Sequence, residues 1–120
     1  MPTRKLQRNE WQHYFDQASR RLPAASVDVE VSGLDLGAQV EAEHLPLEGF
    51  SYDPKDDAFY IICEGLKHKI HHPRSISVRQ QGQSLKAVEV IDNDDHHHVV
   101  TLTAALELPE GRGEAGAGRR

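Results

Sequence analysis

The sequence predicts an α+β protein in which an N-terminal helix packs on a small, strongly twisted antiparallel sheet of about six to eight short strands. Apolar residues recur with a helical period only near the N-terminus, and from residue 26 onward they alternate with polar residues. The sequence offers no second helix to connect parallel strands, and its connections are short. We expect the sheet to close into a β-barrel or to form a half-barrel, because unpaired strand edges promote aggregation.

The helix is predicted from one apolar stripe. Its members follow the spacing i, i+3, i+4, i+7 and i+11, and they are Trp11, Tyr14, Phe15, Ala18 and Leu22. Asn9 is a suitable N-cap, Gln12 can complete a capping box with it, and Pro23 is expected to end the helix. Because aromatic side chains need a broad apolar surface, we expect Trp11 and Phe15 to be buried against the sheet.

The strands are predicted from period-two alternation between turn sequences. In residues 26–32, valines alternate with acidic residues, as expected for a strand with one buried face. A turn is expected at Asp53 and Pro54, because these residue types favour the first two positions of a type I turn. Residues 110–120 are glycine-rich and lack a pattern. The compact domain is therefore predicted to span residues 1–109, followed by a disordered tail.

Composition narrows the class of protein. Cys63 is the only cysteine, so an intrachain disulfide is impossible, and its apolar neighbours predict a buried structural thiol. The chain has no apolar run near the ~18 residues of a membrane span, and no apolar export signal follows its N-terminus. We therefore expect a cytoplasmic protein that does not bind a membrane.

Residues 67–79 form a basic band in a chain whose net charge is −5. The candidate binding residues of this band are Lys67, His68, Lys69, His71, His72, Arg74 and Arg79. The band could bind RNA or another polyanion, yet it contains no aromatic residue to stack on bases. The preferred interpretation is a solvated face whose charges pair with the acidic strands, with His68 half-buried in phase with Leu66 and Ile70.

Residues 92–98 concentrate aspartates and histidines near the C-terminal end of the last predicted hairpin. On a strand, His96 and His98 would point to one face and could share a metal ion, whereas His97 would point to the other face. A durable site needs three or four ligands held by further hydrogen bonds. We therefore predict a solvated turn without a resident metal, in which His96 and His98 are only weak candidates as metal ligands.

The motifs of common enzyme classes do not occur in this sequence. It contains no glycine-rich phosphate loop, no nucleophile-elbow pattern and no helix with paired metal ligands. The single thiol has apolar neighbours that raise its pKa instead of activating it. The sequence therefore predicts no catalytic residue and no cofactor.

Four segments together resemble one protein family: RNEWQHYFD, DLGAQVEAE, GFSYDPKDDAF and LKHKIHHP. The chain is similar, over about residues 2–109, to a family of short bacterial proteins of unknown function, and SYDPKDDA is the most specific segment. The resemblance implies a stand-alone cytosolic domain and supplies no activity, substrate or cofactor. It also implies that the histidine run is peculiar to this member, because relatives usually have a glycine-containing hairpin tip there.

Three functional hypotheses follow from the sequence. The first is a non-enzymatic binding or accessory domain, with an unknown protein partner or a second copy of itself. The alternative is a small-barrel module that binds RNA or a polyanion through residues 67–79, and the third is an unrecognised metal-dependent or hydrolytic enzyme. A binding domain should have an open sheet edge or an apolar patch, and a polyanion binder should gather its cations on one face. An enzyme should have a deep pocket with several titratable groups of shifted pKa.

Overall fold

The computed structural model describes residues 3–21, 25–82 and 84–104. Helix α1 (Trp11–Arg21) follows a short 3₁₀ turn (Arg8–Glu10), and the remainder is strand and turn. The strands are β1 (Thr3–Lys5), β2 (Ala25–Gly33), β3 (Gly37–Asp53), β4 (Ala58–Cys63), β5 (Leu66–His71), β6 (Pro73–Gln81), β7 (Ser84–Asp92) and β8 (His97–Ala104). The predicted α+β class is confirmed.

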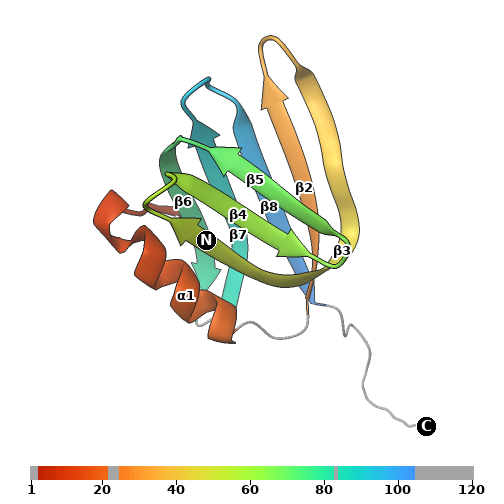
Figure 1. The fold of residues 1–120 in the computed structure, drawn as a ribbon. Helices are drawn as coiled ribbons and strands as arrows, with labels where there is room; N and C mark the ends of the chain where they lie inside the picture. Colours follow the sequence, from red (N-terminus) through yellow and green to blue (C-terminus); the bar gives the residue numbers. More distant parts are fainter. Residues whose placement is uncertain (1–2, 22–24, 83, 105–120) are drawn as a thin grey trace, which may run out of the picture.

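The eight strands form one antiparallel sheet in the order β1-β6-β7-β8-β2-β3-β4-β5. The sheet folds over on itself, so that β4 and β5 lie in front of β6, β7 and β8 (Figure 1). Within the described residues β5 does not pair with β6, because β6 already pairs with β7 on one side and with β1 on the other. Of the two forms that we expected, the closed barrel is therefore wrong, and β5 forms a sheet edge.

The fold-over depends on β3, a single strand of 17 residues. Its first part pairs with β2 from Gly37 to Pro46, and its second part pairs with β4 from Leu47 to Asp53. Register shifts interrupt both ladders near the change of partner, as expected where a strand bends. One continuous strand therefore belongs to both halves of the molecule.

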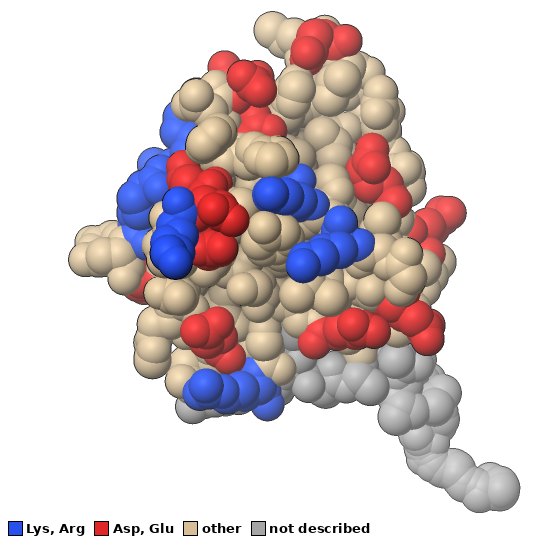
Figure 2. Space-filling model, viewed as in Figure 1, with Lys and Arg blue, Asp and Glu red and all other residues tan. Residues whose placement is uncertain are grey.

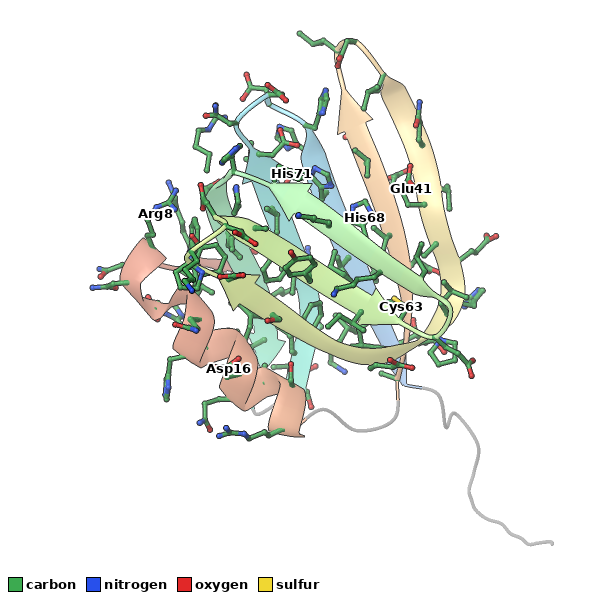
Figure 3. All side chains as sticks on the ribbon, in the orientation of Figure 1. Arg8, Asp16, Glu41, Cys63, His68 and His71 are labelled. Carbon is green, nitrogen blue, oxygen red and sulfur yellow. The ribbon has the colours of Figure 1, made fainter. Side chains whose placement is uncertain are left out.

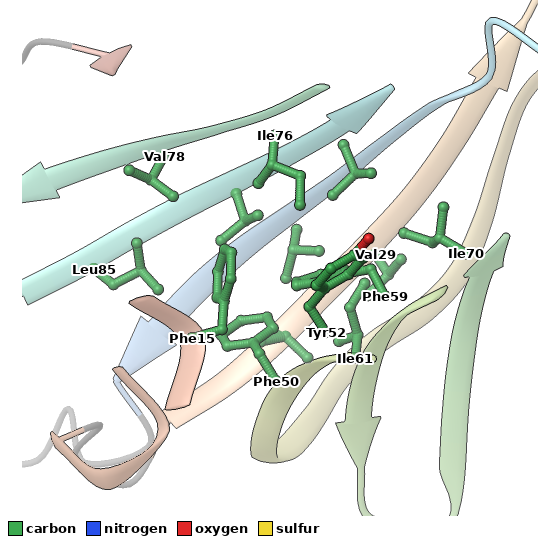
Figure 4. Close-up of a cluster of buried hydrophobic side chains, with 14 of the residues drawn as sticks. Phe15, Val29, Phe50, Tyr52, Phe59, Ile61, Ile70, Ile76, Val78 and Leu85 are labelled. Carbon is green, nitrogen blue, oxygen red and sulfur yellow. The ribbon is translucent and has the colours of Figure 1, made fainter. Parts of the chain in front are cut away.

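The core lies between the two halves of the sheet and α1 (Figure 4). Trp11 is 1% exposed and Phe15 is fully buried, which confirms their predicted position. Phe15 contacts the rings of Phe50 and Phe59 at centroid distances of 5.6 Å and 4.8 Å. Cys63 is a buried free thiol in the same cluster, as predicted, and burial followed by the nearby charge of Glu48 raises its pKa.

The start of the helical segment differs from the prediction. The capping box forms between Gln7 and Glu10, whose side-chain oxygen accepts the backbone N–H of Gln7 at 2.9 Å, instead of between Asn9 and Gln12. The predicted stop at Pro23 and the domain end with its tail lie outside the described residues. No helix in the described part of the chain has the length and apolarity needed to cross a membrane.

Candidate functional site at the edge strand β5

Strand β5 exposes backbone hydrogen-bonding groups at the sheet edge. It follows a two-residue turn in which Gly65 has a φ of +78°, and its described backbone pairing is with β4. The hydrogen bond from His72 N–H to the Asp57 carbonyl (2.8 Å) continues this ladder and fixes which residues face β4. Because bonded and non-bonded pairs alternate in an antiparallel ladder, the backbone groups of Lys67, Lys69 and His71 face away from β4.

The outer face of β5 carries two lysines beside one aromatic ring. The ammonium groups of Lys67 and Lys69 lie 4.7 Å and 5.7 Å from the centroid of the Tyr60 ring. Neither lysine has a carboxylate within 4.0 Å among the described residues. Figure 2 shows basic side chains at the centre of the face formed by β4 and β5, with acidic side chains around them.

A shallow groove runs beside these lysines. Its lining residues come from α1, β3, β4 and β5 and are Gln12, Ser51, Tyr52, Asp53, Tyr60, Ile62 and Lys67. The groove is open to solvent and mixes polar with apolar groups, so it has the form of a contact surface more than of an enclosed active site.

On the inner face of β5, His68 begins a series of hydrogen-bonded side chains. Figure 3 shows His68 and His71 along β5, and His68 Nε2 lies 3.1 Å from His98 Nδ1 on β8. His98 Nε2 in turn lies 2.9 Å from Asp92 Oδ2. An ionised carboxylate only accepts, so His98 Nε2–H donates to Asp92. When His98 is neutral, its Nδ1 therefore accepts from His68 Nε2–H. The second nitrogen of a neutral His68 then keeps its lone pair.

The series continues beyond Asp92 to the β2–β3 turn. Asp92 Oδ1 accepts the backbone N–H of His96 at 3.0 Å, and His96 Nε2 lies 2.9 Å from Asp35 Oδ1. Gly33 permits this approach, because a Cβ at that position would lie 2.7 Å from the His96 ring. We call the five linked residues the histidine chain; they are Asp35, His96, Asp92, His98 and His68.

The surroundings of the histidine chain shift the pKa values of His68 and Asp92. Burial lowers the pKa of His68, the charge of His98 lowers it further, and the charge of Glu41 acts in the opposite direction. Burial alone would raise the pKa of Asp92, but hydrogen bonds from His98 and from the backbone of His96 and Asp94 lower it overall. Near neutral pH, Asp92 is therefore ionised and His68 is neutral.

The predicted solvated turn at residues 92–98 is wrong for its first and last residues. Asp92 and His98 are each 7% exposed. Strand β8 begins at His97, so His96 lies in the turn, while His98 faces the interior in phase with the buried Val100. The described residues form no cluster of three or more His, Cys, Asp or Glu side chains placed to hold one metal ion. His96 and His98 instead bond to Asp35 and Asp92.

The basic band is divided among several surfaces. Lys67 and Lys69 share the outer face of β5, whereas Arg74 pairs with Asp95 and Arg79 lies on β6 in the other half of the sheet. The histidines separate as well, since His68 points inward, His71 is exposed and His72 lies 3.2 Å from Asp57. The structure therefore brings together two of the seven candidate binding residues as an outward-facing cationic pair.

A second polar cluster, which we call the corner, lies where β5 turns into β6. Arg8 donates to Tyr52 Oη at 3.3 Å and to Asp57 at 3.2 Å, and its guanidinium lies 4.4 Å from the Trp11 ring centroid. The Tyr52 hydroxyl also donates to Asp57 at 2.7 Å, and His72 contacts the other carboxylate oxygen. The corner therefore consists of residues from three of the four segments that carry the family resemblance.

The fold and the edge strand define a small α+β domain with an open antiparallel sheet. Residues 2–111 match the "Family of unknown function (DUF5335)", and the chain belongs to this family. An "Uncharacterized protein" of the bacterium Aquifex aeolicus (strain VF5) is 40% identical over 111 residues, which cover 92% of this chain and 100% of the relative. No solved structure matches the chain.

Proposed function

We propose that this protein is a binding domain that accepts an extended, acidic segment of a partner protein along the free edge of β5. The observation that carries the proposal is the outward direction of the backbone groups of Lys67, Lys69 and His71, three exposed residues in one regular strand. An extended peptide can add to such an edge as a further antiparallel or parallel strand through main-chain hydrogen bonds. Exposed β-sheet edges are common recognition surfaces for this reason.

The side chains of the edge favour an acidic partner. Lys67 and Lys69 project to one face, where carboxylates at alternate positions of an added strand would lie beside them. Opposite charges across neighbouring strands contribute about 0.2–1 kcal/mol per pair. Tyr60 lies against both lysines and holds them on this face.

The same lysines disfavour pairing of β5 with β5 of a second copy. An antiparallel pair centred on His68 would place Lys67 opposite Lys69, and like charges at directly opposed positions are destabilising. A second copy offers a complementary edge, because the first part of β3 has a described backbone partner on one side, β2, and carries Glu41 and Glu43. Pairing of β5 with β3 of a second copy is therefore the competing interaction, and an experiment must distinguish it from binding of an acidic partner.

Binding of RNA is supported less well by the positions of the cations. Arg74 is already paired with Asp95, and Arg79 lies on a different part of the sheet from Lys67 and Lys69. A chain with two neighbouring unpaired lysines and a net charge of −5 should bind single-stranded RNA no better than non-specifically, at about 10⁻⁴–10⁻⁶ M at physiological salt.

Fluorescence anisotropy with a labelled peptide of alternating glutamate and valine tests the proposal. We expect binding that Lys67→Glu with Lys69→Glu weakens about tenfold or more, because two attractions become repulsions. Lys86→Glu is the control, since it reverses one charge, against two in the test variant, at an exposed position of β7 and should leave binding intact. A peptide of alternating glutamine and valine should bind more weakly.

Three results would contradict the proposal. They are no binding of the acidic peptide, equal loss in the Lys86→Glu variant, and tight binding of single-stranded RNA that Lys69→Glu with Arg74→Glu removes. Analytical ultracentrifugation of the protein alone supplies a further check. Stable oligomers that Glu41→Lys with Glu43→Lys dissociate would assign the β5 edge to a second copy instead of an acidic partner.

A further inference from the structure

The histidine chain connects the edge strand to the opposite half of the sheet. His68 lies in the middle of β5, whereas His98 lies on β8, four positions away in the strand order. The bond between their rings is therefore a cross-connection between elements that share no backbone ladder. Besides this bond, the inner face of β5 is held by Ile70, which is 1% exposed, and by the partly buried Leu66.

We propose that the His68–His98 pair is a proton-controlled latch that fixes the edge strand at neutral pH and releases it in mildly acidic conditions. A hydrogen bond between two imidazoles needs one N–H and one lone pair. When both rings are protonated, both facing nitrogens carry hydrogen, and two positive charges meet at a distance that now measures 3.1 Å. The pair must then separate, and the inner face of β5 loses its polar connection to β8.

The charged groups around the latch oppose its opening only in part. Among the described residues, the titratable groups that act on His68 are His98 from β8 and Glu41 from β3, and Asp92 from the end of β7 bonds to the far side of His98. Strand β4 places the apolar Ile61 opposite His68. Asp92 can neutralise one imidazolium through its bond to His98, but the same carboxylate cannot neutralise a second one on His68. Burial disfavours the charge on His68 further and lowers its pKa, which places the second protonation below the ordinary histidine value of about 6.5.

Release of the latch should change partner binding, and this effect rests on the proposed function. An edge strand held in position is ready to accept an added strand, whereas a released strand populates that position for only part of the time. Affinity is reduced by the fraction of the competent conformation, so a fall to about a third or a tenth raises the Kd about threefold to tenfold. The latch thus gives the binding edge a pH dependence opposite to that of simple charge attraction, because protonated histidines would otherwise attract an acidic peptide more strongly.

Hydrogen exchange followed by NMR over about pH 7.5 to 5.0 tests the latch without any ligand. After correction for intrinsic exchange rates, the amides of His68 and Ile70, which bond to β4, should lose protection about tenfold as pH falls below about 6.5. His68→Gln keeps a side-chain N–H that can donate to His98 and removes the titration, so its protection should stay constant. His71→Gln changes an exposed histidine of the same strand and should behave like the wild type.

Unchanged protection of β5 in the wild type down to about pH 5.0 would overturn the latch, whatever the variants do. An equal loss of protection in His68→Gln, or its absence in His71→Gln, would overturn it as well. Repeating the acidic-peptide titration at each pH separates the two proposals. A latch seen by exchange with no peptide binding at any pH defeats the proposed function alone, and peptide binding with constant protection defeats the latch alone.

Discussion

The corner and the histidine chain both place an aspartate beside a histidine next to β5, but their surroundings differ. At the corner, the side chains of Asp57 and His72 are 33% and 65% exposed. In the histidine chain, the side chains of Asp92 and His98 are 11% and 8% exposed. The corner also contains the permanent charge of Arg8, whereas the chain places a second histidine, His68, against the first.

The neighbouring groups, together with burial, therefore decide how each cluster responds to acid. At the corner, Asp57 accepts hydrogen bonds from Arg8 and Tyr52 in a partly solvated setting, and neither bond depends on a histidine proton. In the histidine chain, a proton on His68 breaks the bond once His98 is protonated as well, because both facing nitrogens then carry hydrogen. One cluster can therefore fix the end of β5 at any physiological pH, while the other makes its middle sensitive to acid.

The largest expected effect comes from removing the ring of Trp11, which contacts Arg8 and Tyr52 of the corner. Trp11 is 1% exposed, contacts Tyr52 edge-on at 5.1 Å and lies under Arg8. Trp11→Ala should therefore cost about 3–5 kcal/mol of the free energy of unfolding in denaturant melts. His13→Ala, at an exposed position of the same helix, is the control, and equal midpoints for the two variants would remove Trp11 from the core.

The next largest effect distinguishes Asp92 of the histidine chain from Asp57 of the corner. Asp92→Asn places an amide where a buried carboxylate accepts bonds from His98 and from two backbone N–H groups, and should cost about 1–3 kcal/mol. Asp57→Asn at the more exposed corner should cost about 1 kcal/mol or less. Urea melts of both variants at neutral pH measure the two costs. The reverse order would show that burial does not distinguish the clusters.

The pH dependence of the free energy of unfolding should be set by the histidine chain. The folded state lowers the pKa of His68, so below the ordinary value of about 6.5 the unfolded chain binds more protons than the folded one. The free energy of unfolding must then fall as pH falls through this region, and the lowered pKa of Asp92 adds a further loss only in stronger acid. His68→Gln should flatten the decline above about pH 5, and His72→Gln should leave it unchanged. Thermal melts across this range measure the decline for each variant. A flatter decline in His72→Gln than in His68→Gln would refute the assignment.

The last comparison separates neighbouring residues within the histidine run. His98→Asn removes a buried ring and should destabilise the protein by about 1–3 kcal/mol, whereas His97→Asn, on the outer face beside Glu89, should stay within about 0.5 kcal/mol. If the run were the solvated turn predicted from the sequence, we would expect neither change to affect folding. Equal melting temperatures for the two variants would restore that expectation.

Local patterns in the sequence were sufficient for part of this picture. Alternation predicted Lys67 and Lys69 on one face of a strand and His68 on the other, and the apolar stripe predicted the burial of Trp11. The same alternation places His98 in phase with Val100, so its burial could have been predicted had the run not been interpreted as a hairpin tip.

Other features depend on contacts between distant residues and leave no local signal. Arg8 reaches Tyr52 and Asp57 across 44 and 49 positions, and the residues of the corner were visible only as family-like segments. The pairing of β1 with β6, which leaves β5 as an edge, also depends on residues far apart in the chain. Alternation predicts strands but does not predict which strand lies at the edge.

The exchange rates of the backbone amides of Lys67, Lys69 and His71 test the central claim most directly, namely that β5 is a free edge that accepts an extended acidic segment. In the protein alone at neutral pH, these three amides should exchange rapidly, because their N–H groups face away from β4. Saturation with the alternating glutamate and valine peptide should protect them, while the amides of His68 and Ile70 remain protected throughout. Protection of the three edge amides in the free protein, or rapid exchange that persists when the peptide is bound, would contradict the account.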